Sequence, residues 1–371
     1  MPIRICHITT VHPRYDVRIF HKECRSLSST YEVHLIVADG KGDETVEGIH
    51  IHDIGKPAGR RERIFHFAKK AYKKAMETDA TVYHFHDSEL LTTGKKLAQK
   101  GKKVIYDSHE DMPALLSEKE WIPRIFRPLI SSVFAWYERR CIKKFAAIIT
   151  VTPLMTQRFK RSFSNTFQVT NYPICQSDYI DNRRWDFSIC FAGGISKQWM
   201  HANILQSIGK IENATYRLAG IAESSYLEQL KRMPEWKQVE WHGKIPHQSV
   251  NDFIQYSTVG IALNDYVANV GFKEGSLGNT KLFEYMQAGI PVVCTDFRQW
   301  KNIVESTHCG ICVNPHDIQE IASAIKKILT DKDLAKVMGD NGRKAVQEKY
   351  NWESQAETLL YLYSSILKLQ K

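Results

Sequence analysis

The chain has 371 residues, of which 43% are hydrophobic and 25% are charged, a composition that excludes an intrinsically disordered protein. At about 100–200 residues per domain, this length predicts two domains. No run reaches the roughly 18 consecutive apolar residues of a membrane-spanning helix, and the first residues lack the apolar core of a signal peptide. Eight cysteines are too few for a disulfide scaffold in so long a chain. Together these features predict a cytoplasmic protein.

The net charge of +10 arises entirely from the first half of the chain. Residues 1–175 hold 29 Lys and Arg against 19 Asp and Glu, whereas residues 176–371 hold 22 of each. The densest basic stretch, Arg60 to Lys74, has apolar residues at helical spacing and predicts a basic amphipathic helix. This helix is either an ordinary surface helix or, as we predict, one that docks on an anionic membrane face.

Short β-branched runs alternate with helical patterns along the whole chain. The expected strands cover residues 3–8, 33–38, 82–85, 104–106 and 147–151 in the first half, and 189–192, 216–219, 259–263, 291–294 and 310–313 in the second. This alternation is typical of parallel sheets with helices on both faces. It predicts an α/β protein with two doubly wound, Rossmann-like domains. A short segment containing Pro173 separates them and places the hinge near residues 173–184.

Polar residues cluster after three expected strands of the first domain. In such sheets, ligands bind at the carboxyl ends of the strands. The residues at these ends that we select as candidates are His12, Arg14, Asp16, Arg18, His86, Asp87 and His109. The alternative is that they are ordinary polar residues of exposed loops.

The second domain has two features that suit a phosphate ligand. Gly193 and Gly194 directly follow a strand, where paired glycines allow close approach to the backbone. The segment from Ser276 to Met286 is a polar loop that enters an amphipathic helix. The start of this helix suits a diphosphate, Lys281 adds positive charge, and Glu284 one turn further in suits a ribose. An ordinary helix cap with a surface glutamate is the alternative.

Several other functions are excluded by spacing. Gly40 and Gly42 are followed by Thr45 where a dinucleotide fingerprint requires glycine, and no phosphate-binding P-loop sequence occurs. The pair Cys309 and Cys312 has zinc-like spacing but no second pair nearby, so we expect a buried strand there. The only D-x-D sequence begins at Asp331 and indicates a helix cap, so we predict no metal site.

The segment from Gly278 to Val293, with His84–Asp87 and Tyr106–Glu110 upstream, resembles the retaining glycosyltransferases of family 4. These enzymes have the GT-B fold and include those of bacterial surface-polysaccharide biosynthesis. The resemblance implies two domains that face a central cleft. It assigns residues 1–175 to acceptor binding, residues 176–351 to nucleotide-sugar binding, and residues 352–371 to a helix that packs back on the first domain.

The resemblance also implies roles for single residues. Glu284 matches the second glutamate of the E-x7-E motif, which binds the donor ribose, whereas Ser276 replaces the first glutamate. His109 matches the histidine that contacts the transferred sugar. The resemblance places Gly193 and Gly194 at the diphosphate, with Lys197 or Lys281 as its positive charge, and it places Lys244 and Ile245, after a strand and Gly243, at the base. Backbone amides around Leu277 to Asn279 replace the contact of the first glutamate. The donor-binding set also includes Ser276, Gly278, Asn279 and Thr280. The acceptor residues are His12, Arg14, Asp16, Arg18, His86 and Asp87.

The expected enzyme is a hexosyltransferase that needs no cofactor or metal and uses a UDP- or GDP-linked sugar. Its acceptor is a saccharide or a lipid-linked saccharide, and an anionic membrane surface is a further expected partner. Two alternatives remain at this point. A sugar-nucleotide epimerase would use His109 with Glu110 or Asp111 as acid and base. A nucleic-acid-binding protein would use the basic first half, although that half lacks interleaved aromatic residues.

Overall fold

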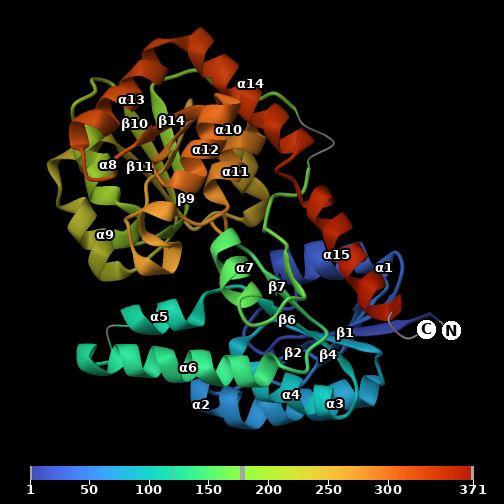
Figure 1. Cartoon of the computed structure of the whole chain (residues 1–371). Coiled ribbons are helices and arrows are strands. Elements are labelled where there is room, and N and C mark those ends of the chain that lie inside the picture. The colour runs from blue at the N-terminus through green and yellow to red at the C-terminus, as the bar shows by residue number, and fades with distance from the viewer. Residues whose placement is uncertain (1, 120, 176–179, 369–371) are drawn as a thin grey trace. The chain divides into compact units, whose positions relative to one another are not determined.

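The computed structural model describes residues 2–119, 121–175 and 180–368. The chain divides into two compact units (Figure 1). Unit 1 comprises Met1–Asn171 and Trp352–Lys371, and unit 2 comprises Tyr172–Asn351. The hinge predicted at residues 173–184 falls partly on residues 176–179, which lie outside the described residues. None of the helices in the described part of the chain combines the length and apolar composition needed to cross a bilayer.

Unit 1 contains an eight-stranded sheet in the order β3-β4-β2-β1-β5-β6-β7-β8. Strand β3 pairs antiparallel with β4, and the other neighbours are parallel. The strands are β1 (Arg4–Ile8), β2 (Glu32–Val37), β3 (Glu44–Val46), β4 (Ile49–Asp53), β5 (Val82–Phe85), β6 (Lys103–Ser108), β7 (Ala147–Thr150) and β8 (Thr166–Gln168). The five strands predicted in the first half are therefore present, whereas β3, β4 and β8 were missed. The β3–β4 turn uses Glu47 and Gly48, both with positive φ.

Helical segments cover both faces of this sheet. They are η1 (Val17–Cys24), α1 (Arg25–Ser28), α2 (Arg60–Glu62), η2 (Arg63–Phe67), α3 (Ala68–Thr78), η3 (Ser88–Leu90), α4 (Leu91–Gln99), α5 (Met112–Glu118), η4 (Arg124–Phe126), α6 (Arg127–Ile142), α7 (Pro153–Lys160) and α15 (Trp352–Lys368). The basic helix predicted over Arg60–Lys74 is present as the continuous run α2-η2-α3, whose central part is π-helical. Within this run Phe67 is buried, whereas Phe65 is 71% exposed.

The C-terminal helix α15 completes the core of unit 1. Its side chains Trp352, Leu359, Leu362, Tyr363 and Ile366 pack with buried residues of β1, β2, β6 and β7 on one face of the sheet. The other face packs against α3, α4, α6 and α7. Burial of apolar area of this kind is the main favourable term in folding. Helix α15 therefore belongs to the first unit although unit 2 precedes it in sequence.

Unit 2 contains six parallel strands in the order β11-β10-β9-β12-β13-β14. They are β9 (Ser188–Ile195), β10 (Thr215–Ala222), β11 (Val239–Gly243), β12 (Val259–Ala262), β13 (Val292–Thr295) and β14 (Gly310–Val313). All five strands predicted in the second half are present, and β11 is the strand expected before Lys244. Alternate residues of β9 point to opposite faces: Ile189 and Phe191 join one core, while Cys190 and Ala192 join the other.

The connections of unit 2 form the two helical layers. One core includes α8 (His201–Ile208), α9 (Ser224–Lys231) and α13 (Ile318–Thr330), and the other includes α10 (Val250–Gln255), α11 (Lys281–Ala288), α12 (Arg298–Thr307) and α14 (Lys332–Glu348). Short turns η5 (Lys197–Trp199), η6 (Pro234–Gln238), η7 (His247–Ser249), η8 (Ala268–Val270) and η9 (Phe272–Glu274) fill the loops. Asp331 caps α14 by accepting the backbone N–H of Leu334 at 2.9 Å, as its sequence predicts.

Glycine is required where the ends of β9 and β10 meet. Gly220 has φ +145°, and a Cβ at this position would lie 1.7 Å from the carbonyl oxygen of Gly193. We expect Gly220→Ala to lower the free energy of unfolding by about 1–3 kcal/mol, because the two strand ends would be forced apart. Urea denaturation of the full chain measures this. Gly194→Ala is the control, since a Cβ there meets nothing within 4 Å; equal unfolding midpoints for both variants would contradict the prediction.

Candidate active site

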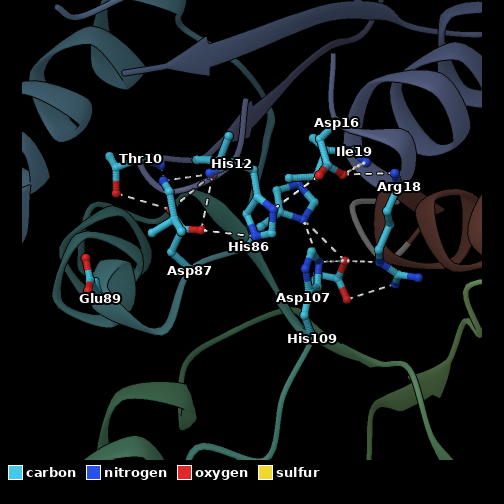
Figure 2. A network of polar contacts seen from close by, with 12 residues as sticks. Thr10, His12, Asp16, Arg18, Ile19, His86, Asp87, Glu89, Asp107 and His109 are labelled. Atoms are coloured by element: carbon cyan, nitrogen blue, oxygen red, sulfur yellow. Dashed lines mark hydrogen bonds and ion pairs between the residues drawn. The ribbon is translucent and has the colours of Figure 1, made fainter. Parts of the chain in front are cut away.

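A network of charged and polar side chains lies at the carboxyl ends of β1, β5 and β6 in unit 1 (Figure 2). Asp107 is at its centre and is completely buried. The Arg18 guanidinium donates to both of its oxygens at 3.0 and 3.0 Å. His109 Nε2 and His86 Nδ1 lie 2.8 and 3.2 Å from Asp107 Oδ2. Burial alone would raise the pKa of Asp107, but Arg18 and His109 hold it well below its ordinary value. Asp107 is therefore an ionised carboxylate that orients both histidines.

Arg18 is held in place by the start of the π-helical segment Val17–Cys24. Asp16 precedes this segment, and its side chain accepts the backbone N–H groups of Arg18 and Ile19 at 2.9 and 3.0 Å. The Arg18 side chain is buried and also donates to the carbonyl of Val169 at 3.0 Å. A buried guanidinium requires such partners, because an unpaired charge in the interior is costly. Asp16 and Arg18 thus act as positioning residues for Asp107.

Asp87 shapes the loop that follows β1. Its Oδ2 accepts the backbone N–H groups of Thr10 and Val11 at 2.5 and 3.2 Å. His12 lies between two carboxylates, with Nδ1 3.3 Å from Asp16 and Nε2 3.7 Å from Asp87. Burial alone would lower the pKa of His12, but these carboxylates raise it. The His12 and His109 rings lie 5.1 Å apart, so the structure brings these two predicted residues together.

Arg14 is engaged by a different part of unit 1. Its guanidinium donates to Asp39 at 2.7 and 2.6 Å, to Glu44, and to the carbonyl of Gly42 at 3.1 Å. Only 4% of Arg14 is exposed. These contacts hold the loop before β3. They account for the burial of Arg14 without any ligand, and its role in acceptor binding stays a prediction.

A cavity of about 810 Å³ within unit 1 opens beside this network. His12, His86, Asp87 and His109 contribute to its wall. The rest of the lining includes the cations Arg60, Arg63, Lys69, Lys96 and Lys119, the apolar side chains Ile64, Phe65, Met112, Leu115, Leu116 and Phe134, and the carboxylates Glu89 and Glu110. Glu89 accepts hydrogen bonds from Arg63 at 2.8 and 3.0 Å. Such a mixture suits a ligand with an anionic group and an apolar part. The wall formed by α5 and α6 was not predicted, because nothing in the sequence of these helices indicates which cavity they line.

An exposed apolar surface lies on η4 and α6. The residues of this α6 surface and their exposed fractions are Trp121 68%, Ile125 80%, Phe126 52%, Leu129 61%, Val133 55% and Trp136 59%. Exposed cations accompany them, namely Arg124, Arg139, Arg140, Lys143 and Lys144. Contiguous exposed apolar residues beside cations are typical of a surface that contacts another molecule or a membrane.

In unit 2, Gly193, Lys281 and Glu284 come together where β9 ends and α11 begins. A Cβ at Gly193 would lie 2.9 Å from Lys281 Cε, so the lysine side chain lies over the glycine. Lys281 Nζ is 2.6 Å from Glu284 Oε2, and the Thr280 hydroxyl donates to Glu284 Oε1 at 2.5 Å. Glycine, lysine and glutamate thus form a compact polar site at a helix N-terminus, which favours anions.

The loop before α11 is ordered by its own side chains. The Asn279 side chain accepts the backbone N–H of Lys281 at 3.1 Å, and Ser276 Oγ accepts that of Gly278 at 3.1 Å. The Ser276 carbonyl accepts Trp300 Nε1–H at 2.9 Å. Ser276 therefore has a local structural role at the position of the first motif glutamate.

Two groups of side chains in the described part of the chain lie close enough together to hold a metal ion. They are His7 with Glu23, His84 and His86, and His86 with Asp107 and His109. Both groups belong to unit 1. The donor-binding residues predicted in unit 2 include no such group among the described residues.

Two family models match the chain. Residues 17–166 match the model described as "Glycosyltransferase Family 4", and residues 184–345 match "Glycosyl transferases group 1". Together these matches cover most of both units. The protein belongs to the family 4 type of glycosyltransferase.

Solved structures with the same fold match nearly the whole length of this chain. A sucrose-phosphate synthase from Thermosynechococcus elongatus is 15% identical, with a TM-score of 0.76 over 99% of this chain and 100% of that chain. HepE from Anabaena, solved with UDP and glucose, is 13% identical, with a TM-score of 0.72 over 98% and 100%. These similarities confirm the predicted GT-B fold of two parallel-sheet, Rossmann-like domains.

Curated relatives match shorter parts of the glycosyltransferase. CapM, a capsular polysaccharide biosynthesis glycosyltransferase of Staphylococcus aureus, is 31% identical over 96 residues, which are 26% of this chain and 25% of CapM. The chain spans between 22% and 45% of the lengths of the curated relatives that it matches.

The structure places the predicted donor residues of the glycosyltransferase at strand and helix ends of unit 2. Most of them lie at the end of β9 or at the start of α11, namely Gly193, Gly194, Gly278, Asn279, Thr280, Lys281 and Glu284. Lys197 is exposed in η5, after β9. Lys244 and Ile245 follow β11, whose final residue Gly243 has φ +64°. Their ligand-binding roles stay predictions.

Proposed function

We propose that this glycosyltransferase moves a sugar from a UDP- or GDP-linked donor to a saccharide or lipid-linked saccharide, with retention of anomeric configuration and without a catalytic metal ion. The donor binds to unit 2 and the acceptor binds to unit 1. The relationship to CapM, a capsular polysaccharide biosynthesis glycosyltransferase, supports a role in polysaccharide biosynthesis. We assign this role to the cytoplasmic face of a membrane, as the sequence predicts. Family membership favours this function over the epimerase and the nucleic-acid-binding protein.

The contact of Lys281 with both Gly193 and Glu284 carries the proposal. A diphosphate at this point meets the α11 N-terminus and the Lys281 ammonium, while the absent side chain of Gly193 leaves room for it. Glu284 is one turn inside the helix, where its carboxylate accepts hydrogen bonds from the two ribose hydroxyls. HepE, which shares the fold, was solved with UDP, and this supports a uridine nucleotide as the first donor to test.

In the proposed transfer, the bond between the sugar anomeric carbon and the diphosphate oxygen breaks as the acceptor oxygen bonds the same face of that carbon. The acceptor hydroxyl proton passes to the departing phosphate oxygen. Negative charge grows on the diphosphate, and the helix terminus and Lys281 stabilise it. His109 contacts the transferred sugar. The ionised Asp107 fixes the imidazole ring of His109, whose Nε2 lies 2.8 Å from Asp107 Oδ2.

The acceptor binds in the cavity of unit 1. Its wall holds both cations and apolar side chains, which favours a lipid-linked saccharide whose phosphate meets Arg60 or Lys69. The α6 surface carries exposed tryptophans beside cations. We therefore assign anionic membrane contact to this surface together with the basic α2-η2-α3 run, in which Phe65 is exposed.

A panel of UDP- and GDP-sugars, monitored for slow donor hydrolysis, tests the proposed function most directly. Hydrolysis of one nucleotide sugar, with its anomeric product followed by NMR, identifies the donor and the stereochemical course. Absence of both binding and hydrolysis across the panel would contradict the proposal.

We predict that Glu284→Gln lowers the affinity for nucleoside diphosphate by about tenfold or more. Loss of a charged hydrogen-bond partner costs about 1.5–3 kcal/mol, and the substitution also removes the anionic partner of Lys281. Calorimetric titration of UDP and GDP into both proteins measures the change. Thermal melts serve as the folding control, and Glu305→Gln, an exposed glutamate of α12, is the matched variant. Equal affinities would show that Glu284 does not bind the donor.

We predict that His109→Ala lowers kcat at least about 100-fold, because a group contacting the reacting sugar is lost. EDTA should leave the initial rate of the wild-type enzyme unchanged under conditions in which EDTA also leaves the melting temperature of the protein unchanged. Loss of activity at constant melting temperature, with recovery on addition of Mn²⁺, would show instead that His109 belongs to a catalytic metal site.

We predict that the protein cosediments with vesicles of phosphatidylserine and phosphatidylcholine at low ionic strength, and that salt weakens the binding. Each cation near the surface contributes about 1 kcal/mol. The double variant Ile125→Ser/Leu129→Ser should bind at least about tenfold more weakly, because two inserted apolar side chains are lost. Val337→Ser removes a side chain of similar exposure, 56%, from α14 of unit 2 and is the control. No wild-type cosedimentation, or equal loss in both variants, would remove the membrane assignment.

A further inference from the structure

Three histidines and a glutamate form a buried cluster in unit 1, and only one of them, His86, also reaches the wall of the acceptor cavity. His7 lies on β1, Glu23 on η1, and His84 and His86 on β5. The side chains of all four are completely buried. Titratable side chains are rarely buried in such numbers without a cation or a full set of hydrogen bonds.

The distances within this cluster fit a tetrahedral ion. Glu23 Oε2 lies 3.9, 3.8 and 4.0 Å from His7 Nδ1, His84 Nε2 and His86 Nε2. His7 Nδ1 and His86 Nε2 are 3.0 Å apart. Bonds of about 2.0–2.1 Å from zinc to its ligands place tetrahedral ligand atoms about 3.3 Å from one another. The four atoms therefore surround a volume of the size that one such ion needs.

Three polar atoms of the cluster have no hydrogen-bond partner among the described residues. They are both carboxylate oxygens of Glu23 and the Nε2 atom of His84. Glu23 Oε1 forms an ion pair with Arg18, 3.0 Å from Nε, although the Nε–H group itself donates to Asp107. Orphaned polar atoms at this depth are costly. A cation bound by Glu23 and His84 would satisfy them.

The second nitrogen of each histidine already has a partner outside the cluster. Tyr363 OH lies 3.2 Å from His7 Nε2 and 2.9 Å from His84 Nδ1. Asp107 Oδ2 lies 3.2 Å from His86 Nδ1. Metal-binding histidines are oriented in this way, with the non-ligating nitrogen bonded to a carboxylate, a carbonyl or another polar group. Each ring therefore presents its other nitrogen to the cluster.

We propose that unit 1 holds one Zn²⁺ ion, bound by His7 Nδ1, Glu23 Oε2, His84 Nε2 and His86 Nε2. Three imidazoles and one carboxylate are ligands that suit zinc, and four protein ligands leave no open position. The ion is structural: it joins β1, η1 and β5, and Tyr363 links it to α15. It takes no part in the transfer, so its test does not depend on the proposed function.

The second possible group, His86 with Asp107 and His109, is less suited to an ion. Both oxygens of Asp107 already accept hydrogen bonds from Arg18. Glu23 contacts the same guanidinium through Oε1 alone, which leaves Oε2 for an ion. His109→Ala therefore distinguishes the two locations.

Metal analysis of the full chain, produced without a polyhistidine tag in zinc-supplemented medium, tests the proposal. Inductively coupled plasma mass spectrometry should find about one zinc per chain after desalting. X-ray absorption at the zinc edge should show nitrogen and oxygen ligands in four-coordinate geometry, without sulfur. Removal of zinc with a strong chelator should lower the melting temperature, and added Zn²⁺ should restore it.

Variants locate the ion. Glu23→Gln should lose the zinc, while Tyr363→Phe should lower zinc affinity by about 10–100-fold, because one hydroxyl orients two ligands. His109→Ala should keep the full zinc content. His50→Ala is a second control, since His50 stacks on His34 in a histidine group on β2 and β4 that is separate from the cluster.

Three results would overturn the proposal. The first is wild-type protein without zinc whose melting temperature responds to neither chelator nor Zn²⁺. The second is zinc that is lost in His109→Ala and kept in Glu23→Gln. The third is zinc with a sulfur ligand in the absorption spectrum. If Glu23→Gln fails to fold, the wild-type stoichiometry, the absorption spectrum and Tyr363→Phe still decide the question.

Discussion

The buried ion pair between Arg18 and Asp107 is the interaction on which the polar network of unit 1 depends. Two hydrogen bonds of 3.0 Å join these side chains in the interior, where removal of one partner would leave an uncompensated charge. Asp107 in turn fixes His86 and His109. One carboxylate therefore connects the outer part of the network, which lines a cavity, with the buried histidines. Its ionised state sets the orientation of every ring that it touches.

Much of the fold follows from periodicity in the sequence. All ten expected strands are present because runs of buried β-branched residues are a strong signal of parallel sheets. The strands β3 and β8 were missed because each has three residues, too few for a period to appear. Strand β4 was missed because His50 and His52 interrupt its apolar residues. Ile49 and Ile51 nevertheless alternate with these histidines, as the antiparallel hairpin of β3 and β4 requires.

The sequence predicts which residues of the candidate site lie at strand ends and helix starts, but not which of their side chains contact one another. Lys281 and Glu284 are recognisable because a polar loop enters a helix there, but their contact with each other and with Gly193 depends on side-chain packing. The burial of Arg14 against Asp39 arises from a loop distant in sequence. His7 and His84 gave no signal at all, since a histidine inside a strand has the same appearance whether it faces a core or a ligand.

Helix α15 has a consequence for the order in which the chain folds during synthesis. Unit 2 is a continuous stretch of sequence, whereas unit 1 needs residues 352–368 to cover one face of its sheet. The ribosome therefore releases every residue of unit 2 before unit 1 can complete the core on this face, although unit 1 begins first. Until then, η1 and α1 cover only part of the apolar face made by β1, β2 and β6, and a nascent chain with the remainder exposed to water is a substrate for chaperones.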